Sequence, residues 1–147
     1  MQTLDISFDV ALPIDEVYRA VGNIGEFGYV LAGVKDVTML DEDRSEWKVE
    51  VRAGMIAQTL TLQGQVTERQ PPRLLAFASQ GKNVQVRGRI ELSATEPAVT
   101  VCRVAVEAEV TGRLAPIVDL ISRTTQKQMI AQTIENFRLK LAQKAAE

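Results

Sequence analysis

Hydrophobic and polar residues alternate along most of the chain before residue 110. In the first such stretch, Leu4, Ile6 and Phe8 alternate with polar residues. A period of two is typical of a β-strand with one buried face. Six further alternating stretches follow near Val37, Trp47, Gln58, Leu74, Val84 and Cys102. Because short turns, such as SATEPA at 93–98, separate these stretches, the pattern predicts about seven antiparallel strands.

A helical period replaces the alternation after Pro13, a residue that suits the first position of a helix. Apolar residues on one face predict a short helix of about ten residues; they are Ile14, Val17, Tyr18 and Val21. The following segment, 22–34, holds four of the nine glycines and predicts a broken second helix and a loop. This segment is either a tight connection or a mobile flap over a pocket.

The longest helical segment runs from Leu114 to Ala145 and comes last. It carries two apolar stripes: Leu114, Ile117, Val118 and Ile121, then Met129, Ile130, Thr133, Ile134, Phe137 and Leu141. At about 100° per residue, the two stripes point nearly half a turn apart. One straight helix cannot bury both stripes against one sheet. We therefore expect a break near Ser122–Thr125, or two halves that bury against different elements.

Each predicted strand has one apolar and one polar or charged face, which indicates a single sheet with one covered face. Only the predicted helices are available to cover it. The fold class is therefore α+β: a curved antiparallel sheet of about seven strands wrapped on a long C-terminal helix, with two short helices after the first strand. The 147 residues are expected to form one domain, 1–147.

Composition narrows the function classes. The chain is 46% hydrophobic and 24% charged, as in soluble globular proteins. A net charge of -2 argues against binding to nucleic acid. The single cysteine, Cys102, excludes an internal disulfide. With no signal-peptide pattern and no apolar run of about 20 residues, a cytoplasmic protein is expected.

Residues that commonly carry catalysis are scarce. The chain has no histidine, which excludes Ser-His-Asp and Cys-His arrangements and histidine-based metal sites. Cys102 falls among inward valines, where a cysteine behaves as an inert core residue. Gly22, Gly25 and Gly28 follow a helix and precede no buried parallel strand, so they do not form a dinucleotide site. No catalytic residue, metal or cofactor is predicted.

Several segments are similar to those of one family and together cover nearly the whole chain. They are LAGV at 31–34 (with Ala32 in place of the family's proline), the hairpin glycine Gly54, LTLQGQVTERQPPRLL at 60–75, GKNVQVRGRIEL with its central Gly88, GRLAPIVDLI at 112–121, and Phe137. The chain resembles the CoxG family, which is associated with carbon monoxide dehydrogenase. The order of its predicted elements resembles the helix-grip fold of the START-like (SRPBCC) superfamily, to which the CoxG family belongs.

The resemblance implies a cavity between the sheet and the last helix that holds an apolar or aromatic small molecule, such as a lipid or a polyketide. It also implies an accessory role beside a molybdenum-containing dehydrogenase. Some members carry a C-terminal membrane anchor; none is expected here, so membrane contact should be peripheral at most. The candidate ligand-binding residues are Phe27, Val30, Leu31, Trp47, Val49, Leu60, Leu62, Phe77, Val86, Ile117 and Ile121. For Trp47, core packing competes with stacking on a ligand, and for Phe77 the inward direction competes with that of Leu74, Ala76 and Ala78.

Two other functions remain open. A cyclase or aromatase-type enzyme would use the same cavity and need inward polar groups with perturbed pKa values. A surface adaptor for maturation of a molybdenum hydroxylase would have a filled core. A basic side of the last helix is either a solvated face or a site for an anionic membrane or an acidic partner; it consists of Arg113, Arg123, Lys127 and Arg138.

Overall fold

The computed structural model describes residues 2–31, 33–53, 55–112, 115–116 and 123–145. Its sheet has seven antiparallel strands in the order β1-β7-β6-β5-β4-β3-β2. The strands are β1 Gln2–Val10, β2 Val34–Met39, β3 Arg44–Ala53, β4 Ile56–Gln70, β5 Leu74–Gly81, β6 Val84–Glu96 and β7 Val99–Val110. The helices are α1 Ile14–Gly22, α2 Ile24–Phe27, the 3-10 helix η1 Gly28–Val30, and α4 Arg123–Ala145.

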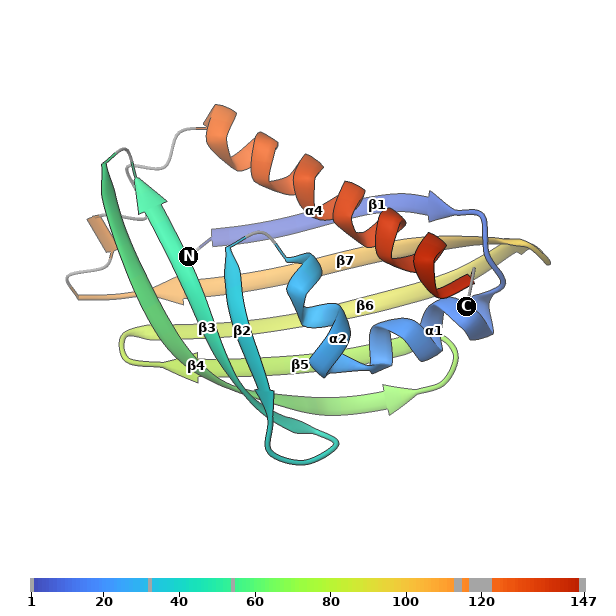
Figure 1. The fold of residues 1–147 in the computed structure, drawn as a ribbon, viewed down its shortest axis with the longest axis horizontal. Coiled ribbons are helices and arrows are strands. Elements are labelled where there is room, and N and C mark those ends of the chain that lie inside the picture. The colour runs from blue at the N-terminus through green and yellow to red at the C-terminus, as the bar shows by residue number, and fades with distance from the viewer. Residues whose placement is uncertain (1, 32, 54, 113–114, 117–122, 146–147) are drawn as a thin grey trace.

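All of these helices lie on one face of the curved sheet, which grips α4 (Figure 1). This is the predicted helix-grip architecture. The alternation of the sequence reappears in the structure, since residues 3–9 of β1 alternate between exposed and partly buried. The glycine-rich segment forms α2 and η1, as the expected broken helix.

One predicted turn is wrong. β6 continues through Ser93 to Glu96, and only Pro97 and Ala98 form the turn to β7. The extra residues pair with β7 across a bulge between Ala94 and Glu96. Their side chains are small or polar and exposed, so backbone pairing alone extends the strand. A pattern of hydrophobic positions does not detect such an extension, because no side chain is buried.

A first apolar cluster fills the space between the helices and the sheet. Its buried members are Val10, Val17, Tyr18, Ala20, Val21, Phe27, Val30, Val66, Leu75, Leu92, Cys102, Phe137 and Leu141. Phe137 of α4 stands at its centre, with its ring 5.3 Å from that of Phe8 and 5.4 Å from that of Phe27, both edge-on. Edge-on aromatic pairs at this spacing add to the gain from apolar burial. One side chain of α4 therefore joins β1 to α2.

Polar contacts hold the same half of α4 in place. The Asn136 amide donates a hydrogen bond of 3.2 Å to the carbonyl of Val30, and Lys140 forms an ion pair of 3.3 Å with Glu26. Arg138 lies 3.7 Å from the Asp9 carboxylate and 5.8 Å from the centre of the Phe8 ring. Arg138 therefore contacts β1 and is not part of a free basic face.

The predicted break in the terminal segment stays a prediction. α4 begins at Arg123, inside the expected interval, but Leu114 and residues 117–122 lie outside the described residues. Of the second stripe, Phe137 and Leu141 are buried whereas Met129 is exposed. None of the described helices combines the length and apolar composition that crossing a membrane requires.

Trp47 of β3 packs against two glycines, Gly28 of η1 and Gly64 of β4. A methyl group on Gly28 would lie 2.6 Å from the outer edge of the indole, and one on Gly64 would lie 2.9 Å from the indole nitrogen. That nitrogen donates a hydrogen bond of 2.6 Å to the hydroxyl of Ser45. The indole thus lies between a helix and a strand that both lack side chains at the point of contact. The structure places Trp47 in packing contact with its own chain.

Replacing Phe137 by alanine should lower the free energy of unfolding by about 3–5 kcal/mol, as expected for a buried phenylalanine. Equilibrium urea unfolding followed by circular dichroism measures this change. Leu139→Ala is the control, since Leu139 is on the same helix but 54% exposed. It should change the free energy of unfolding by less than about 0.5 kcal/mol. Equal losses in both variants would contradict the central role of Phe137.

Gly28→Ala should destabilise the protein by about 1–3 kcal/mol, because the new methyl group would overlap the Trp47 indole. Gly25→Ala is the matched control: its methyl group would meet only the unbranched Met39 side chain, with Cγ at 2.9 Å. Alanine also suits a helix better than glycine. Thermal unfolding and the emission maximum of the single tryptophan measure both variants. Unchanged stability and emission in Gly28→Ala would show that the indole is not tightly enclosed.

Candidate functional site

A second apolar cluster lies on the inner face of the sheet, apart from the first. Leu62 and Val84 are its buried members, and partly buried residues pack against them: Trp47, Val49, Leu60, Val86 and Val110. The strand register explains the grouping, since Trp47 is opposite Leu62 and Val49 is opposite Leu60. Val84 and Val110 are likewise opposite each other on β6 and β7. The inward residues of four strands thus form one continuous apolar surface.

The sheet splits beside this cluster. β4 pairs with β5 only from Gln63 onward, opposite Gln80. The earlier part of β4, residues 56–62, pairs with β3 and with no other described strand. A hollow of about 690 Å³ lies along this part of β4 and reaches the turn between β5 and β6. Its described lining is Gln58, Thr59, Leu60, Thr61, Leu62, Lys82, Asn83, Val84 and Gly112.

The far rim of the hollow has a tightly defined backbone. Asn83 has φ of 64° and Gly112 has φ of +68°, both in the left-handed region. The amide of Thr111 donates a hydrogen bond of 2.8 Å to the carbonyl of Asn83. A methyl group on Gly112 would lie 2.8 Å from the Asn83 side chain, so glycine is needed there. The rim is therefore a rigid junction between the β5–β6 turn and the end of β7.

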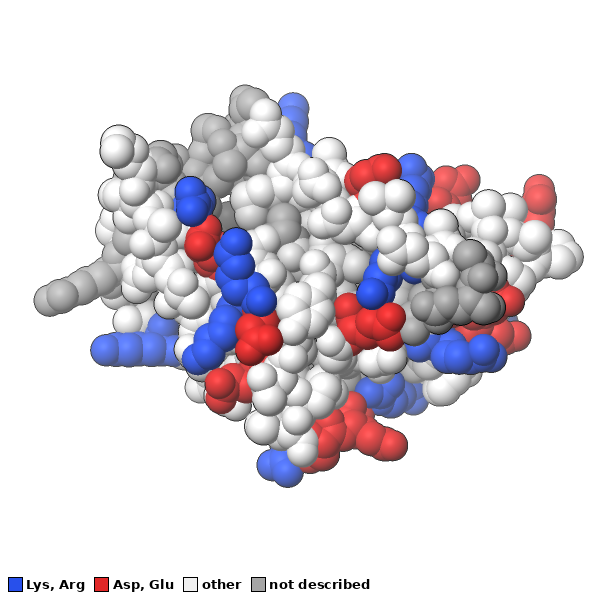
Figure 2. All heavy atoms as spheres, viewed as in Figure 1, with Lys and Arg blue, Asp and Glu red and all other residues white. Residues whose placement is uncertain are grey.

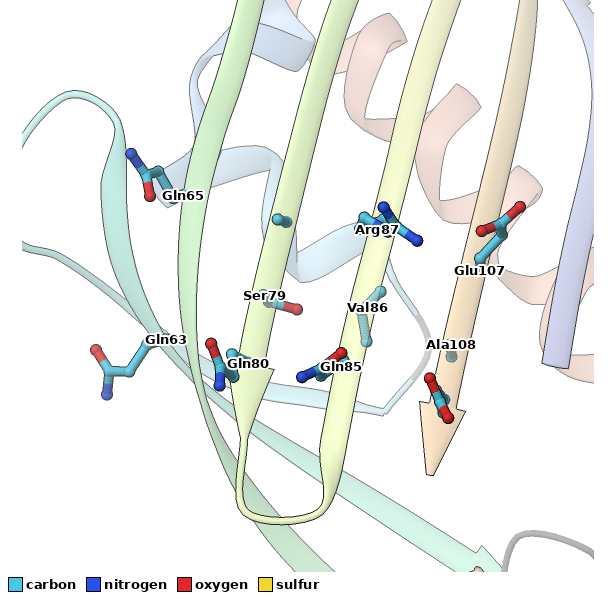
Figure 3. Close-up of a pocket in the computed structure, with 11 residues that line it drawn as sticks. Gln63, Gln65, Ser79, Gln80, Gln85, Val86, Arg87, Glu107 and Ala108 are labelled. Carbon is cyan, nitrogen blue, oxygen red and sulfur yellow. The ribbon is translucent and has the colours of Figure 1, made fainter. Parts of the chain in front are cut away.

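A different hollow, of about 430 Å³, lies on the opposite face of the sheet. Figure 3 shows it from outside, with the helices behind the strands, and Gln80, Gln85, Arg87 and Glu107 along β5, β6 and β7. Seven of its eleven lining residues are glutamine, arginine or glutamate. Such a lining suits water or a polar molecule and does not provide the mainly apolar walls of a pocket for an apolar ligand.

The structure brings five of the predicted ligand-binding residues together. Trp47, Val49, Leu60, Leu62 and Val86 all belong to the second cluster. Three strands contribute these residues, which are up to about 40 positions apart in the chain.

The other predicted ligand-binding residues lie elsewhere. Phe27 and Val30 are in the first cluster, in the core around Phe137, while Leu31 is exposed. Phe77 lies against β6, with its ring 2.3 Å from where a methyl group on Gly88 would be. Ile117 and Ile121 lie outside the described residues.

Val84 and Val110 were not among the predicted ligand-binding residues. The alternation of apolar and polar residues did place both on the inward faces of β6 and β7. What the alternation could not show is that these ends of the strands lie across the split from Leu60 and Leu62. For Lys82 and Asn83 on the rim, the sequence pattern indicated only a turn and not a ligand-binding site.

Two ionisable side chains, Cys102 and Tyr18, are buried near the inner face of the sheet. Cys102 is fully buried, and burial raises the pKa of its thiol to about 12. The Tyr18 hydroxyl donates a hydrogen bond of 2.9 Å to the carbonyl of Leu74, and desolvation raises its pKa. Both groups therefore stay protonated near neutral pH, and neither is a ready nucleophile or base.

The remaining buried polar groups serve the fold. Ser45 accepts the hydrogen bond from Trp47, and the Thr100 hydroxyl donates one of 2.8 Å to the carbonyl of Leu12. Among the described residues, no group of three or more aspartate, glutamate or cysteine side chains is placed to hold a metal ion. The part of the chain that the structure describes thus offers an apolar surface and a hollow, without a cluster of reactive groups.

Solved structures with this fold come from several bacteria. A conserved protein from Geobacillus kaustophilus has a TM-score of 0.77 at 18% identity, with 97% of this chain and 96% of that chain covered. A START superfamily protein from Mycobacterium smegmatis has a TM-score of 0.68 at 14% identity, covering 95% and 93%. The Zhui aromatase/cyclase from Streptomyces sp. R1128 has a TM-score of 0.58 at 13% identity, covering 98% and 93%. At these identities the likeness shows the START-like fold alone.

The family follows from the sequence. No curated protein is similar enough in sequence to count as a relative. The family model for CoxG, a subunit of carbon monoxide dehydrogenase, however, matches residues 7–142, which include nearly all of the described strands and of α4. With its START-like fold and this match over most of its length, the chain belongs to the CoxG family of carbon monoxide dehydrogenase subunits.

Proposed function

We propose that the protein binds an apolar or aromatic small molecule on the second cluster, where β4 separates from β5. One observation carries the proposal: five of the seven cluster residues are only partly buried, and Leu60, Leu62 and Val84 of the cluster also line the 690 Å³ hollow. Apolar side chains are thus left incompletely covered beside a space of ligand size.

The size of the hollow and the apolar cluster beside it support a small apolar ligand. Ligand sites typically have volumes of about 300–1,000 Å³ and mostly apolar walls with a few polar groups. Here the apolar lining residues are Leu60, Leu62 and Val84, whereas Gln58, Thr59, Thr61, Lys82 and Asn83 are polar. The apolar surface for a ligand therefore comes from the second cluster beside the hollow. Covering such a surface gains about 25 cal/mol per Å² of apolar area removed from water.

We also propose that ligand binding serves an accessory role beside a molybdenum-containing dehydrogenase. The family description supports this, because it names a subunit of carbon monoxide dehydrogenase. Reactive groups are scarce on the inner face among the described residues, which favours an accessory over a catalytic role. The ligand would be delivered to the dehydrogenase or carried away from it.

A cyclase or aromatase activity has weaker support. One structure with this fold is an aromatase/cyclase, but at 13% identity. Such chemistry would require a free acid or base facing the ligand. The described inward hydroxyls of Tyr18, Ser45 and Thr100 all take part in hydrogen bonds within the fold.

Binding can be followed by energy transfer from Trp47, the single tryptophan, to the uncharged probe N-phenyl-1-naphthylamine. A probe on the second cluster should quench Trp47 emission as it fluoresces. Leu60→Glu should weaken probe binding at least about tenfold, because a carboxylate is costly to enclose with an apolar ligand. Leu139→Glu makes the same change on an exposed part of α4 and should leave probe affinity unchanged.

Equal affinity of the wild-type protein and Leu60→Glu would place the ligand elsewhere. Circular dichroism of both variants shows whether the fold is intact. Native mass spectrometry of protein purified from its own host, followed by solvent extraction, identifies the natural ligand. Failure of any apolar molecule to co-purify or bind would overturn the carrier proposal.

A further inference from the structure

The turn between β3 and β4 exposes large apolar side chains. Met55 is fully exposed and Ile56 is 49% exposed. We call these two residues the ribbon tip. Isolated exposed apolar residues are common on protein surfaces, so exposure alone does not define a site. Three further features indicate a function for the tip: its position on the sheet, the lack of charge on the ribbon and the basic residues nearby.

The ribbon tip stands at the end of a projecting two-stranded ribbon. β2 reaches only as far as Val49 of β3, and β5 reaches only as far as Gln63 of β4. Beyond these points, residues 51–53 and 56–58 pair only with each other among the described strands. Figure 1 shows the paired ends of β3 and β4 standing clear of β2 and β5. Met55 and Ile56 therefore lie where neither neighbouring strand covers them.

The ribbon also lacks charge. Residues 53–67 contain no aspartate, glutamate, lysine or arginine, although these types make up 24% of the chain. On the outward side of β4, the pattern is Ala57, Thr59 and Thr61. An uncharged ribbon can enter the interface of a bilayer without the cost of desolvating a charged group.

Basic residues lie at the base of the ribbon and across the hollow. Arg52 forms an ion pair with Glu50 and donates a hydrogen bond to its carboxylate. This hydrogen bond and the nearby charges of Arg52 and Lys35 lower the pKa of Glu50. Two cations thus face one carboxylate. Lys82 stands on the opposite rim of the hollow. Figure 2 shows a largely uncharged surface at this end, with basic and acidic side chains side by side below it. The protein as a whole has a net charge of -2, whereas Lys35, Arg52, Lys82 and Glu50 together carry +2.

We propose that Met55 and Ile56 insert into the interface of an anionic lipid membrane, with Arg52 and Lys82 near the lipid headgroups. Apolar anchors combined with nearby cations are what peripheral attachment to anionic lipid requires. A protein partner fits less well, because a stable interface buries about 800 Å² on each side, far more than two side chains at a tip.

Docking in this orientation places the hollow close to the membrane. Leu60 and Leu62 follow Ile56 on the same strand and line the hollow. An apolar ligand could then pass between bilayer and cluster without crossing much water. Docking itself does not depend on ligand binding, whereas this exchange rests on the proposed function.

The first experiment places an environment-sensitive nitrobenzoxadiazole label at the tip through Met55→Cys. Selective labelling is feasible because Cys102 is fully buried. Vesicles of phosphatidylcholine mixed with phosphatidylglycerol should shift the label's emission to the blue. The same label at Leu40→Cys, an apolar position 57% exposed in the β2–β3 loop, should show no shift. An unshifted label at residue 55, or equal shifts at both positions, would overturn the proposal.

The second experiment measures co-sedimentation with the same vesicles. A protein carrying both Met55→Ser and Ile56→Ser should partition about tenfold less, since two apolar anchors are lost. Leu40→Ser should partition like the wild type. Wild-type partitioning should fall when phosphatidylglycerol is omitted or salt is raised. Equal sedimentation of the double variant and the wild type would show that another surface contacts the membrane, and would refute the proposal that the ribbon tip inserts.

Two controls separate the possible failures. The double variant should bind N-phenyl-1-naphthylamine normally without vesicles, so a loss of docking is distinguished from a loss of ligand binding. Its thermal unfolding should match that of the wild type, because both residues are exposed. A tip label that responds to a purified molybdenum-containing dehydrogenase but not to vesicles would show a protein contact and reject the membrane.

Discussion

The packing of Phe137 against Phe8 and Phe27 is the contact on which the rest of the structure depends. A single antiparallel sheet with one apolar face is stable only if other elements cover that face. Phe137 connects the long helix to the first strand and to the short helices at once. The surrounding polar contacts, from Asn136 and Lys140, then fix how α4 lies across the sheet. This one set of contacts determines which part of the sheet becomes a filled core.

The consequence is that the apolar face is divided. Near Phe137, residues such as Leu75, Cys102 and Leu141 are fully buried. At the other end, Val49, Leu60 and Val86 remain partly exposed around Leu62 and Val84. Trp47 stands at this second end, held between Gly28 and Gly64. The proposed ligand site requires such a division, because a core packed throughout at normal density leaves no room for a ligand.

The splitting of the sheet connects the second cluster to the outside. Since β4 leaves β5 at Gln63, its earlier residues line a hollow on one side and project as a ribbon on the other. The same strand therefore carries Leu60 and Leu62 at the hollow and Ile56 near the turn. The proposed binding site and the proposed membrane contact are adjacent because both lie on the part of β4 that has separated from β5. The lack of charge from residue 53 to 67 suits both roles.

The sequence by itself determined the fold class, the seven strands, the faces they bury and the family. These follow from local periodicity and from segments such as those around Gly88 and Phe137, because a period of two forces alternate side chains to one face. It predicted inward positions such as Leu60, Leu62 and Val86 but could not group them. Phe27 and Leu60 look alike as apolar positions in the sequence, yet one packs on Phe137 and the other borders a hollow. Only the tertiary structure decided this, because it depends on where β4 separates from β5 and on how far α4 reaches. Both are set by contacts between residues distant in the chain, which leave no periodic trace in the sequence.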